Sequence, residues 1–203
     1  AITGLTGAAS DVIDALASTG ITTVVDNSLA VTVSGNTSVA DINTINADSA
    51  TGVVTATATE TAAATLIGLT TTNADMITVT MAAASTAATD LNTIDGKTGT
   101  AVNATAITAL TGAAADVKTA LASNGITTVT DASLAVIVSG NTSVADINTI
   151  NADTATGVVT AIANEKDATT LVTLTTSSTD AITVTMAAAS TAASTGASTG
   201  AST

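Results

Sequence analysis

Acidic and amide side chains are the residues of this chain that could do chemistry. The triplet Asn-Ala-Asp occurs three times, each time where a helix-like pattern gives way to a strand-like one. Carboxylate and carbonyl oxygens are the ligands that calcium prefers. The pattern therefore makes calcium the one candidate cofactor. The alternative is a turn that ends each helix, since Asn and Asp favour such turns. The candidate ligands are Asn46, Asp48, Asn73, Asp75, Asn151 and Asp153.

No constellation of residues predicts catalysis. The sequence contains no His and no Cys, so the many Ser and Thr hydroxyls lack the usual base that would activate one of them. Paired carboxylates need a cleft and separated pKa values, and a monotonous repeat predicts neither. Lys97 stands in a Gly-Lys-Thr string, but the glycine that a phosphate-binding loop requires further upstream is absent. We therefore expect no catalytic residues and a protein that is not an enzyme.

The charge balance excludes further classes of function. Sixteen acidic residues face only three basic ones, which gives a net charge of -13, and the sequence has no aromatic residue. Such a chain would repel nucleic acids and anionic membranes and has no ring on which a base could stack. No apolar run reaches the roughly 18 residues that a membrane-spanning helix needs. We expect no nucleic-acid partner and no membrane insertion.

A long internal repeat determines the organisation of the chain. Residues 1–88 recur at residues 106–193, and about three quarters of the aligned residues are identical. The last residues, 194–203, form a Ser/Thr/Gly/Ala low-complexity tail. Because the first residue already lies inside a repeat, we expect the chain to come from a longer array. The predicted divisions are a first long repeat at 1–105, a second, incomplete copy at 106–193, and the tail at 194–203.

Each long repeat contains a shorter rhythm, in which a helix-like stretch precedes a strand-like one four times. Thr or Ser opens every helix-like stretch and could cap its free N–H groups, and apolar residues follow at helical spacing. The strand-like stretches alternate β-branched residues with Thr or Ser. Residues 21–28 could add a second short strand. The helix-like stretches start at Thr6, Thr37, Thr61, Thr86 and Thr111, and the strand-like ones are 28–35, 52–59, 76–81 and 100–107.

Strand–helix–strand units of this size place their strands side by side in parallel through a right-handed crossover. The spacing of the units falls mostly within the roughly 20–29 residues of leucine-rich-type repeats. The predicted fold class is therefore α/β: a solenoid of short helix–strand coils with a parallel sheet on one face. The structural alternative is two tandem compact α/β domains.

The repeat style resembles that of known proteins. The string TSVADINTINADTATGVVTA at 142–161, with ITVT strands and Ala/Ser/Thr-rich helices, resembles the Ala/Thr-rich repeat arrays of giant bacterial surface and secreted proteins. The resemblance covers nearly all of residues 1–193 and transfers no catalytic residue. It implies an adhesin stalk, a surface-layer component or an extracellular fibre, and therefore an extracellular or cell-surface location.

Three functions stay open at this point. The first is a structural repeat protein, a protomer or segment of a filament, surface layer or stalk, whose partner is another copy of itself stacked head to tail. The second is an adhesin-type binding module for a glycan or mineral surface. The third is ice binding through outward Thr ladders, in which Thr55 and Thr57 would align with Thr78 and Thr80 on one side and with Thr32 and Ser34 on the other. The change of Thr32 to Ile137 and of Thr57 to Ile162 in the second copy speaks against this third function.

Overall fold

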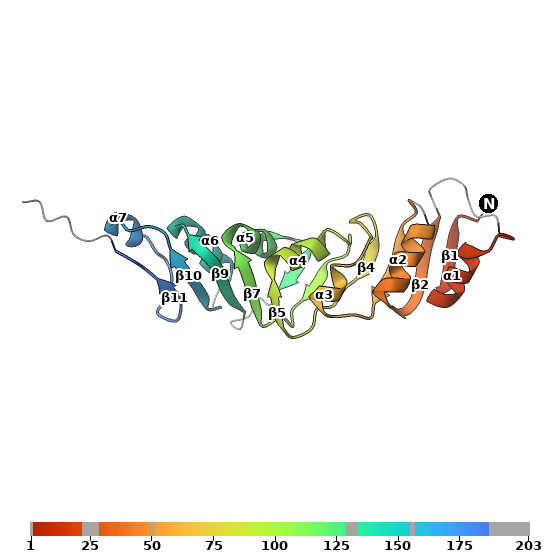
Figure 1. The fold of residues 1–203 in the computed structure, drawn as a ribbon, viewed down its shortest axis with the longest axis horizontal. Coiled ribbons are helices and arrows are strands. Elements are labelled where there is room, and N and C mark those ends of the chain that lie inside the picture. The colour runs from red at the N-terminus through yellow and green to blue at the C-terminus, as the bar shows by residue number, and fades with distance from the viewer. Residues whose placement is uncertain (1, 22–28, 50, 129–133, 155–156, 187–203) are drawn as a thin grey trace, which may run out of the picture.

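A computed structural model describes residues 2–21, 29–49, 51–128, 134–154 and 157–186 of the 203-residue chain. It shows an elongated molecule of mixed α/β structure in which strands and helices alternate along the chain (Figure 1). The elements follow one another in sequence order from one end of the long axis to the other. Each segment therefore packs mainly against the segments that precede and follow it.

The described part of the chain holds short strands and short helices. The strands are β1 (Gly4–Ala8), β2 (Ala30–Thr37), β3 (Val54–Ala58), β4 (Met76–Thr78), β5 (Ser85–Ala87), β6 (Val102–Ala104), β7 (Ala109–Ala113), β8 (Ile126–Thr128), β9 (Ala135–Thr142), β10 (Val159–Ala163) and β11 (Ala181–Thr183). The helices are α1 (Ala9–Ala17), α2 (Val39–Asp48), α3 (Ala63–Leu66), α4 (Ala88–Asp95), α5 (Ala114–Ala122), α6 (Val144–Asp153) and α7 (Ala168–Leu171).

Every strand pair of the described residues is parallel, as the spacing of the units predicts. The strands form sheets with the orders β1-β2-β3-β4, β6-β8 and β11-β10-β9-β7-β5. The sheets are joined where β4 ends, because Thr80 forms a parallel bridge with Asn103 and the Met81 N–H donates to the Asn103 carbonyl at 2.8 Å. Backbone pairing thus continues from the four-stranded sheet into the units that follow.

The core lies between the strands and the layer of helices. The apolar stripes predicted for the helices are confirmed: Val39, Ile42 and Ile45 of α2 are buried, and so are Leu91 and Ile94 of α4. On the strands, the predicted alternation is also confirmed: in β2 and β3 the inward Val and Ala residues are buried, Thr32 and Thr55 are exposed, and Thr57 is half-buried. Helices of two to three turns are marginal in isolation, so this burial is what stabilises them.

The two copies have nearly the same residues at their core positions. Among the described residues that are buried in the first copy, only Ser49 is replaced in the second, where Thr154 takes its place. The other substitutions at described residues fall on exposed or half-buried positions. Because nearly every buried position keeps its side chain, the inner parts of the two copies can pack in the same way.

Three strands stand where the sequence predicted helices. The stretches that begin at Thr6, Thr86 and Thr111 open as β1, β5 and β7 and become helical only at Ala9, Ala88 and Ala114. These strands are rich in Ala, Gly, Ser and Thr, which carry little strand signal of their own. They are extended because a neighbouring strand offers its backbone, as in the register Gly4↔Ala30.

The prediction that a Thr or Ser side chain caps each helix is confirmed for two of the helices that the structure describes, α2 and α6. Ser38 accepts a hydrogen bond from the Asp41 N–H at 3.1 Å, and Ser143 accepts one from the Asp146 N–H at 3.1 Å. The residues that precede α1, α3, α4 and α5 are alanines, which offer no side-chain cap. For α1, α4 and α5 the preceding strand residue lies directly before the helix, so the hydroxyl lies too far upstream.

One detail of the strands differs from the sequence prediction, and a second lies mostly outside the described residues. The sequence prediction aligned Thr55 with Thr78 and Thr57 with Thr80, but Thr55 lies opposite Met76 and Thr57 opposite Thr78, which interrupts the predicted Thr ladder. Residues 22–28, most of the segment expected to add a short strand, lie outside the described residues. Its counterpart in the second copy does form a strand, β8.

A glycine bends each of the two longest strands. Gly35 in β2 has φ 77° and Gly140 in β9 has φ 75°, a backbone conformation that side chains disfavour. At these points the register with the next strand shifts, from Thr32↔Thr55 to Asn36↔Thr57 in the first copy. Each strand can therefore continue around the corner of its unit into the helix that follows.

Candidate functional site

The six candidate calcium ligands occupy two kinds of position. Two of the pairs lie in the last turns of α2 and α6, where Asp48 and Asp153 are exposed. The third pair lies in the turn before β4, where Asn73 is exposed and Asp75 is only 5% exposed. The members that the structure brings together are Asn46 and Asp75, which line one cavity of about 240 Å³ with Thr51, Gly52, Val53, Thr72 and Ala74.

The Asp75 carboxylate joins two neighbouring units through backbone N–H groups. Its Oδ1 accepts from the Val54 N–H at 2.9 Å, and its Oδ2 accepts from the Thr72 N–H at 2.9 Å. Its backbone carbonyl accepts from the Gly99 N–H at 2.7 Å in the following unit. A buried carboxylate that accepts two N–H bonds is satisfied without a metal. The structure thus gives Asp75 a role in holding units together.

The same contact recurs in the second copy. Asp180 accepts from the Val159 N–H at 2.8 Å and from the Ser177 N–H at 2.7 Å. Burial alone would raise the pKa of Asp180, but the bonds from Val159 and Ser177 outweigh it and lower the pKa below its ordinary value. The carboxylate is therefore ionised at neutral pH, the form that accepts both N–H bonds.

A second carboxylate caps a helix of the preceding unit. Glu60 follows β3, and its Oε2 accepts from the Val39 N–H at the start of α2, at 2.9 Å. Glu165 makes the same contact with the Val144 N–H of α6 at 3.0 Å. The first N–H groups of a helix have no partner within the helix and carry partial positive charge. Each glutamate therefore satisfies one such group and favours the close approach of two units.

Asparagine amides form a third inter-unit contact. The Asn43 amide group donates to the Gly68 carbonyl at 2.8 Å, and its oxygen accepts from the Thr70 N–H at 2.8 Å. Asn148 in the second copy donates to the Thr173 carbonyl at 2.8 Å and accepts from the Thr175 N–H at 2.9 Å. Each amide thus pairs with the backbone of the next unit almost as a strand would. The neighbouring predicted ligands Asn46 and Asn151 donate to the Thr70 and Thr175 carbonyls.

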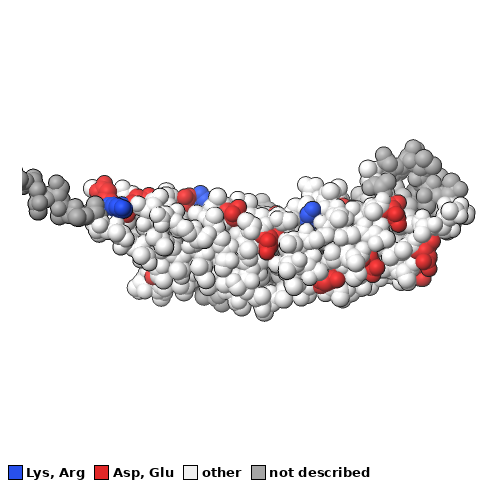
Figure 2. All heavy atoms as spheres, in the orientation of Figure 1, with Lys and Arg blue, Asp and Glu red and all other residues white. Residues whose placement is uncertain are grey.

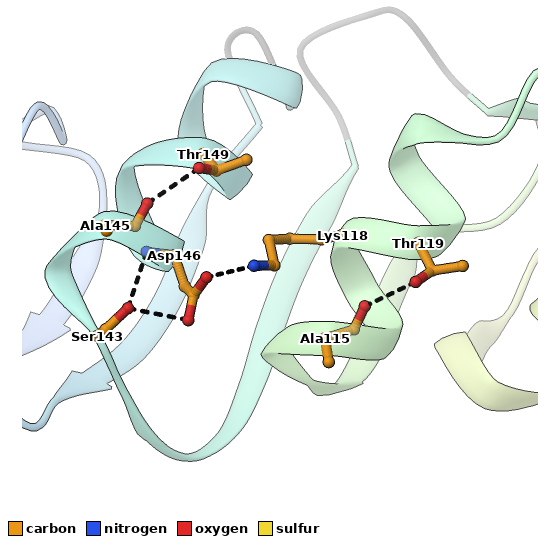
Figure 3. A network of polar contacts seen from close by, with 7 residues as sticks. All are labelled: Ala115, Lys118, Thr119, Ser143, Ala145, Asp146 and Thr149. Atoms are coloured by element: carbon orange, nitrogen blue, oxygen red, sulfur yellow. Dashed lines mark hydrogen bonds and ion pairs between the residues drawn. The ribbon is translucent and has the colours of Figure 1, made fainter.

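One ion pair joins α5 to α6 (Figure 3). Lys118 reaches Asp146, which also accepts a hydrogen bond from the Ser143 hydroxyl at 2.9 Å. The bond from Lys118 and then that from Ser143 lower the pKa of Asp146 below its ordinary value. Ile13 takes the place of Lys118 in the first copy, where Ser38 and Asp41 still form the helix cap. The ion pair is therefore an addition to the repeated contacts and not part of them.

Figure 2 shows acidic side chains spread along the molecule, with the few lysines among them. Within the ranges that the structure describes, no three or more acidic side chains gather as a group that could hold a metal ion. The calcium site stays a prediction of the sequence. No helix among these residues is long and apolar enough to cross a membrane.

A second hollow lies between α3 and β5. It has a volume of about 300 Å³ and is lined mostly by small side chains. Met81 is also in the lining, and Asp90 is its one charged residue. The first hollow has the polar side chains Asn46, Thr51, Thr72 and Asp75 in its lining, and the Asp75 carboxylate already accepts from the Val54 and Thr72 N–H groups.

Comparisons with known proteins give no match: no protein-family model, no curated protein and no solved structure is detectably similar to this chain. The contacts between units are therefore the basis for the function proposed below.

Sequence reasoning missed most of these contacts. It singled out Asp75 as a metal ligand but passed over Glu60 and Asn43. A signal was present, because Glu60, Asp75 and Asn43 are all unchanged in the second copy, at Glu165, Asp180 and Asn148, whereas the exposed Asn73 is replaced by Ser178.

Proposed function

We propose that the chain is a structural repeat protein whose units stack as an α/β solenoid. In this proposal it is a protomer or segment of an extracellular filament, surface layer or stalk, and it assembles end to end with further copies. It has no catalytic role. The repeated inter-unit contacts of Asp75, Glu60 and Asn43 support this proposal, because a stack of units is stabilised mainly by the interfaces between neighbours.

The junction between the two long repeats favours one stack over two separate domains. Strand β5 of the first copy pairs in parallel with β7 of the second. Helix α4 packs against α5, and the Asn92 amide donates to the Asp116 carbonyl at 3.0 Å. The Ser123 hydroxyl donates to Asp95 at 2.8 Å. The junction thus has backbone pairing like that inside each copy, and its asparagine makes only the donor half of the contact made by Asn43 and Asn148, because the Asn92 Oδ1 has no partner among the described residues.

Apolar side chains that are exposed at the two ends of the described stack support the proposal of end-to-end assembly. At the internal junction Met81 and Ile107 are each 2% exposed, because the neighbouring units cover them. Their counterparts at the two ends, Met186 and Ile2, are 55% and 44% exposed. A further unit placed against either end would bury these side chains as the internal units do. Head-to-tail contacts generate an open fibre when the rotation between copies does not close into a ring, and the elongated shape of the stack favours the fibre.

Negative-stain electron microscopy of the purified chain tests this proposal. We expect long, uniform fibres from the wild-type chain. The variant Met186→Glu should give short rods, because a charge would then be buried at each end-to-end contact. Val172→Glu is the matched control: Val172 is 80% exposed, and its counterpart Ile67 is also exposed although a further unit follows it. This control should form fibres.

The same grids, prepared with calcium and then with a chelator, test the calcium prediction. Fibres that disappear in chelator would put cations at the contacts between molecules. Isolated short rods from the wild-type chain under both conditions would contradict end-to-end assembly.

A further inference from the structure

The turn that follows α5 contains the one Asn-Gly step of the sequence, Asn124-Gly125. Asn124 is exposed, and among the described residues no hydrogen bond holds its side-chain amide. An asparagine amide that precedes glycine is open to attack by the glycine backbone nitrogen, because glycine has no side chain to block the approach. The attack requires the Gly125 N–H to lose its proton, so the group that accepts this proton determines the rate.

The Gly125 N–H lies at the end of a hydrogen-bonded relay. It donates to the Ser123 Oγ at 3.0 Å, and the Ser123 hydroxyl donates to the Asp95 Oδ2 at 2.8 Å. The carboxylate lies directly against the turn, since a Cβ at Gly125 would overlap the Asp95 Oδ1. The Gly125 carbonyl accepts from the Val102 N–H at 2.8 Å, which holds the turn in place. A carboxylate that reaches a proton through one hydroxyl is positioned to act as a general base.

We propose that Asn124 is a site of spontaneous deamidation, which Ser123 and Asp95 promote. As the Gly125 nitrogen forms a bond to the Asn124 Cγ, its proton passes to the Ser123 Oγ, and the Ser123 proton passes to Asp95. The C–N bond of the side-chain amide then breaks, and its nitrogen takes up the relayed proton and leaves as ammonia. Water opens the five-membered cyclic imide that results, and residue 124 becomes an aspartate or an isoaspartate. Ser123 contacts the reacting nitrogen, and Asp95 acts through Ser123.

The equivalent turn of the first copy, residues 18–20, lacks the reactive parts. Its Gly20 N–H donates to the Ser18 Oγ at 3.3 Å, as in the second copy, but Thr19 takes the place of the asparagine. In the part of the chain that the structure describes, no carboxylate bonds to the Ser18 hydroxyl. The reactive site arises at the junction, where α4 of the first copy brings Asp95 to a turn of the second. Deamidation adds a negative charge beside Asp95 and should weaken this junction.

The relay gives the reaction a characteristic dependence on pH. An aspartate is ionised from neutral to mildly alkaline pH, so a reaction driven by Asp95 has a nearly constant rate there. Deamidation driven by hydroxide instead accelerates in proportion to the hydroxide concentration. Of the elements with the main contacts to α4, α3, β5 and β7 hold no titratable side chain, and α5 holds Asp116 and Lys118. Asp90 lies in the first turn of α4, and Lys97 lies just beyond its end.

Peptide mass spectrometry of the full chain, sampled during incubation at neutral pH, tests the proposal. The chain carries Thr19→Asn, which places a second Asn-Gly step beside Ser18, without a carboxylate partner. One digest reads the deamidation of both steps in the same molecules. We expect Asn124 to react about a hundredfold faster, the low end of what general-base catalysis supplies. Its rate should change little from neutral to mildly alkaline pH, whereas the introduced step should accelerate with hydroxide.

Adding Ser123→Ala to this chain removes the relay and leaves Asn124 and Gly125 in place. Deamidation at Asn124 should then slow to the rate of the introduced step. If Ser123→Ala prevents folding, as circular dichroism would show, the comparison within the Thr19→Asn chain still decides. Equal rates at the two steps of the folded chain would overturn the proposal, and so would a rate at Asn124 that follows the hydroxide concentration. Neither result depends on whether the chain forms fibres.

Discussion

Replacing Asp75 with alanine is expected to destabilise the chain by about 2–5 kcal/mol, because it leaves two backbone N–H groups without acceptors. The bond from the Val54 N–H is buried, and the bond from the Thr72 N–H is partly buried. Asp75→Asn should cost less, since one amide oxygen still accepts from one of these groups. Urea denaturation of the three chains, followed by circular dichroism, measures the differences.

The control for this prediction is Asp48→Ala. Asp48 is exposed and lies in the last turn of α2, where the negative end of the helix dipole disfavours a carboxylate. Its removal should change the free energy of unfolding by less than about 0.5 kcal/mol. Equal midpoints for Asp75→Ala and Asp48→Ala would show that Asp75 does not hold units together.

Substituting Gly52 with alanine is expected to cost about 3 kcal/mol or more, as overpacking against rigid backbone does. A Cβ at this position would lie 1.9 Å from the Leu29 carbonyl oxygen of the preceding unit. No side-chain rotation relieves that overlap, so the backbones of two units must move apart. The equivalent Gly157 would meet the Leu134 carbonyl oxygen at 2.2 Å, and Gly157→Ala should have a similar effect.

Gly4→Ala is the matched comparison for Gly52→Ala. A Cβ at Gly4 finds its nearest neighbour, the Ala30 carbonyl oxygen, at an ordinary 3.8 Å, and the second copy already has Ala109 at this position. Thermal unfolding should therefore give nearly the wild-type midpoint for Gly4→Ala and a much lower one for Gly52→Ala. A Gly52→Ala chain as stable as the wild type would mean that the units are not packed as closely as the structure has them.

The periodic part of the fold could be predicted from the sequence because burial imposes its own period. Ile42 and Ile45 recur at helical spacing since one stripe of α2 faces the core, and Val31 and Val33 alternate with polar residues because one face of β2 is inward. Parallel pairing followed from the length of the units. The Ser38 cap was also predictable, because the cap and its acid lie within one short string.

The remaining features depend on contacts that no local pattern contains. Strands β1, β5 and β7 owe their conformation to a neighbouring strand and not to their own Ala, Gly and Thr residues. The role of Asp75 depends on the Val54 N–H, 21 residues away, which becomes available only when two units meet. Carboxylates that bind calcium and carboxylates that accept backbone N–H groups look alike in a sequence.

In the proposed stack both copies are continuous, and a single engineered disulfide across their junction distinguishes this arrangement from two separate domains. The chain has no native cysteine, so an introduced pair reports on one contact alone. In the register of β5 with β7, Ser85 lies opposite Ala109 across the junction of the copies. Neighbouring strands lie at a separation that a disulfide can bridge.

The measurement is the fraction of Ser85→Cys/Ala109→Cys chains that form an intramolecular disulfide under mild oxidation, read as loss of free thiol in the monomer. The comparison is Ser85→Cys/Ala113→Cys, whose second cysteine lies four residues further along β7, a shift of about 13 Å. The proposed stack predicts nearly complete closure of the first pair and little of the second. Equally slow closure of both pairs would contradict the stack and favour two separate α/β domains.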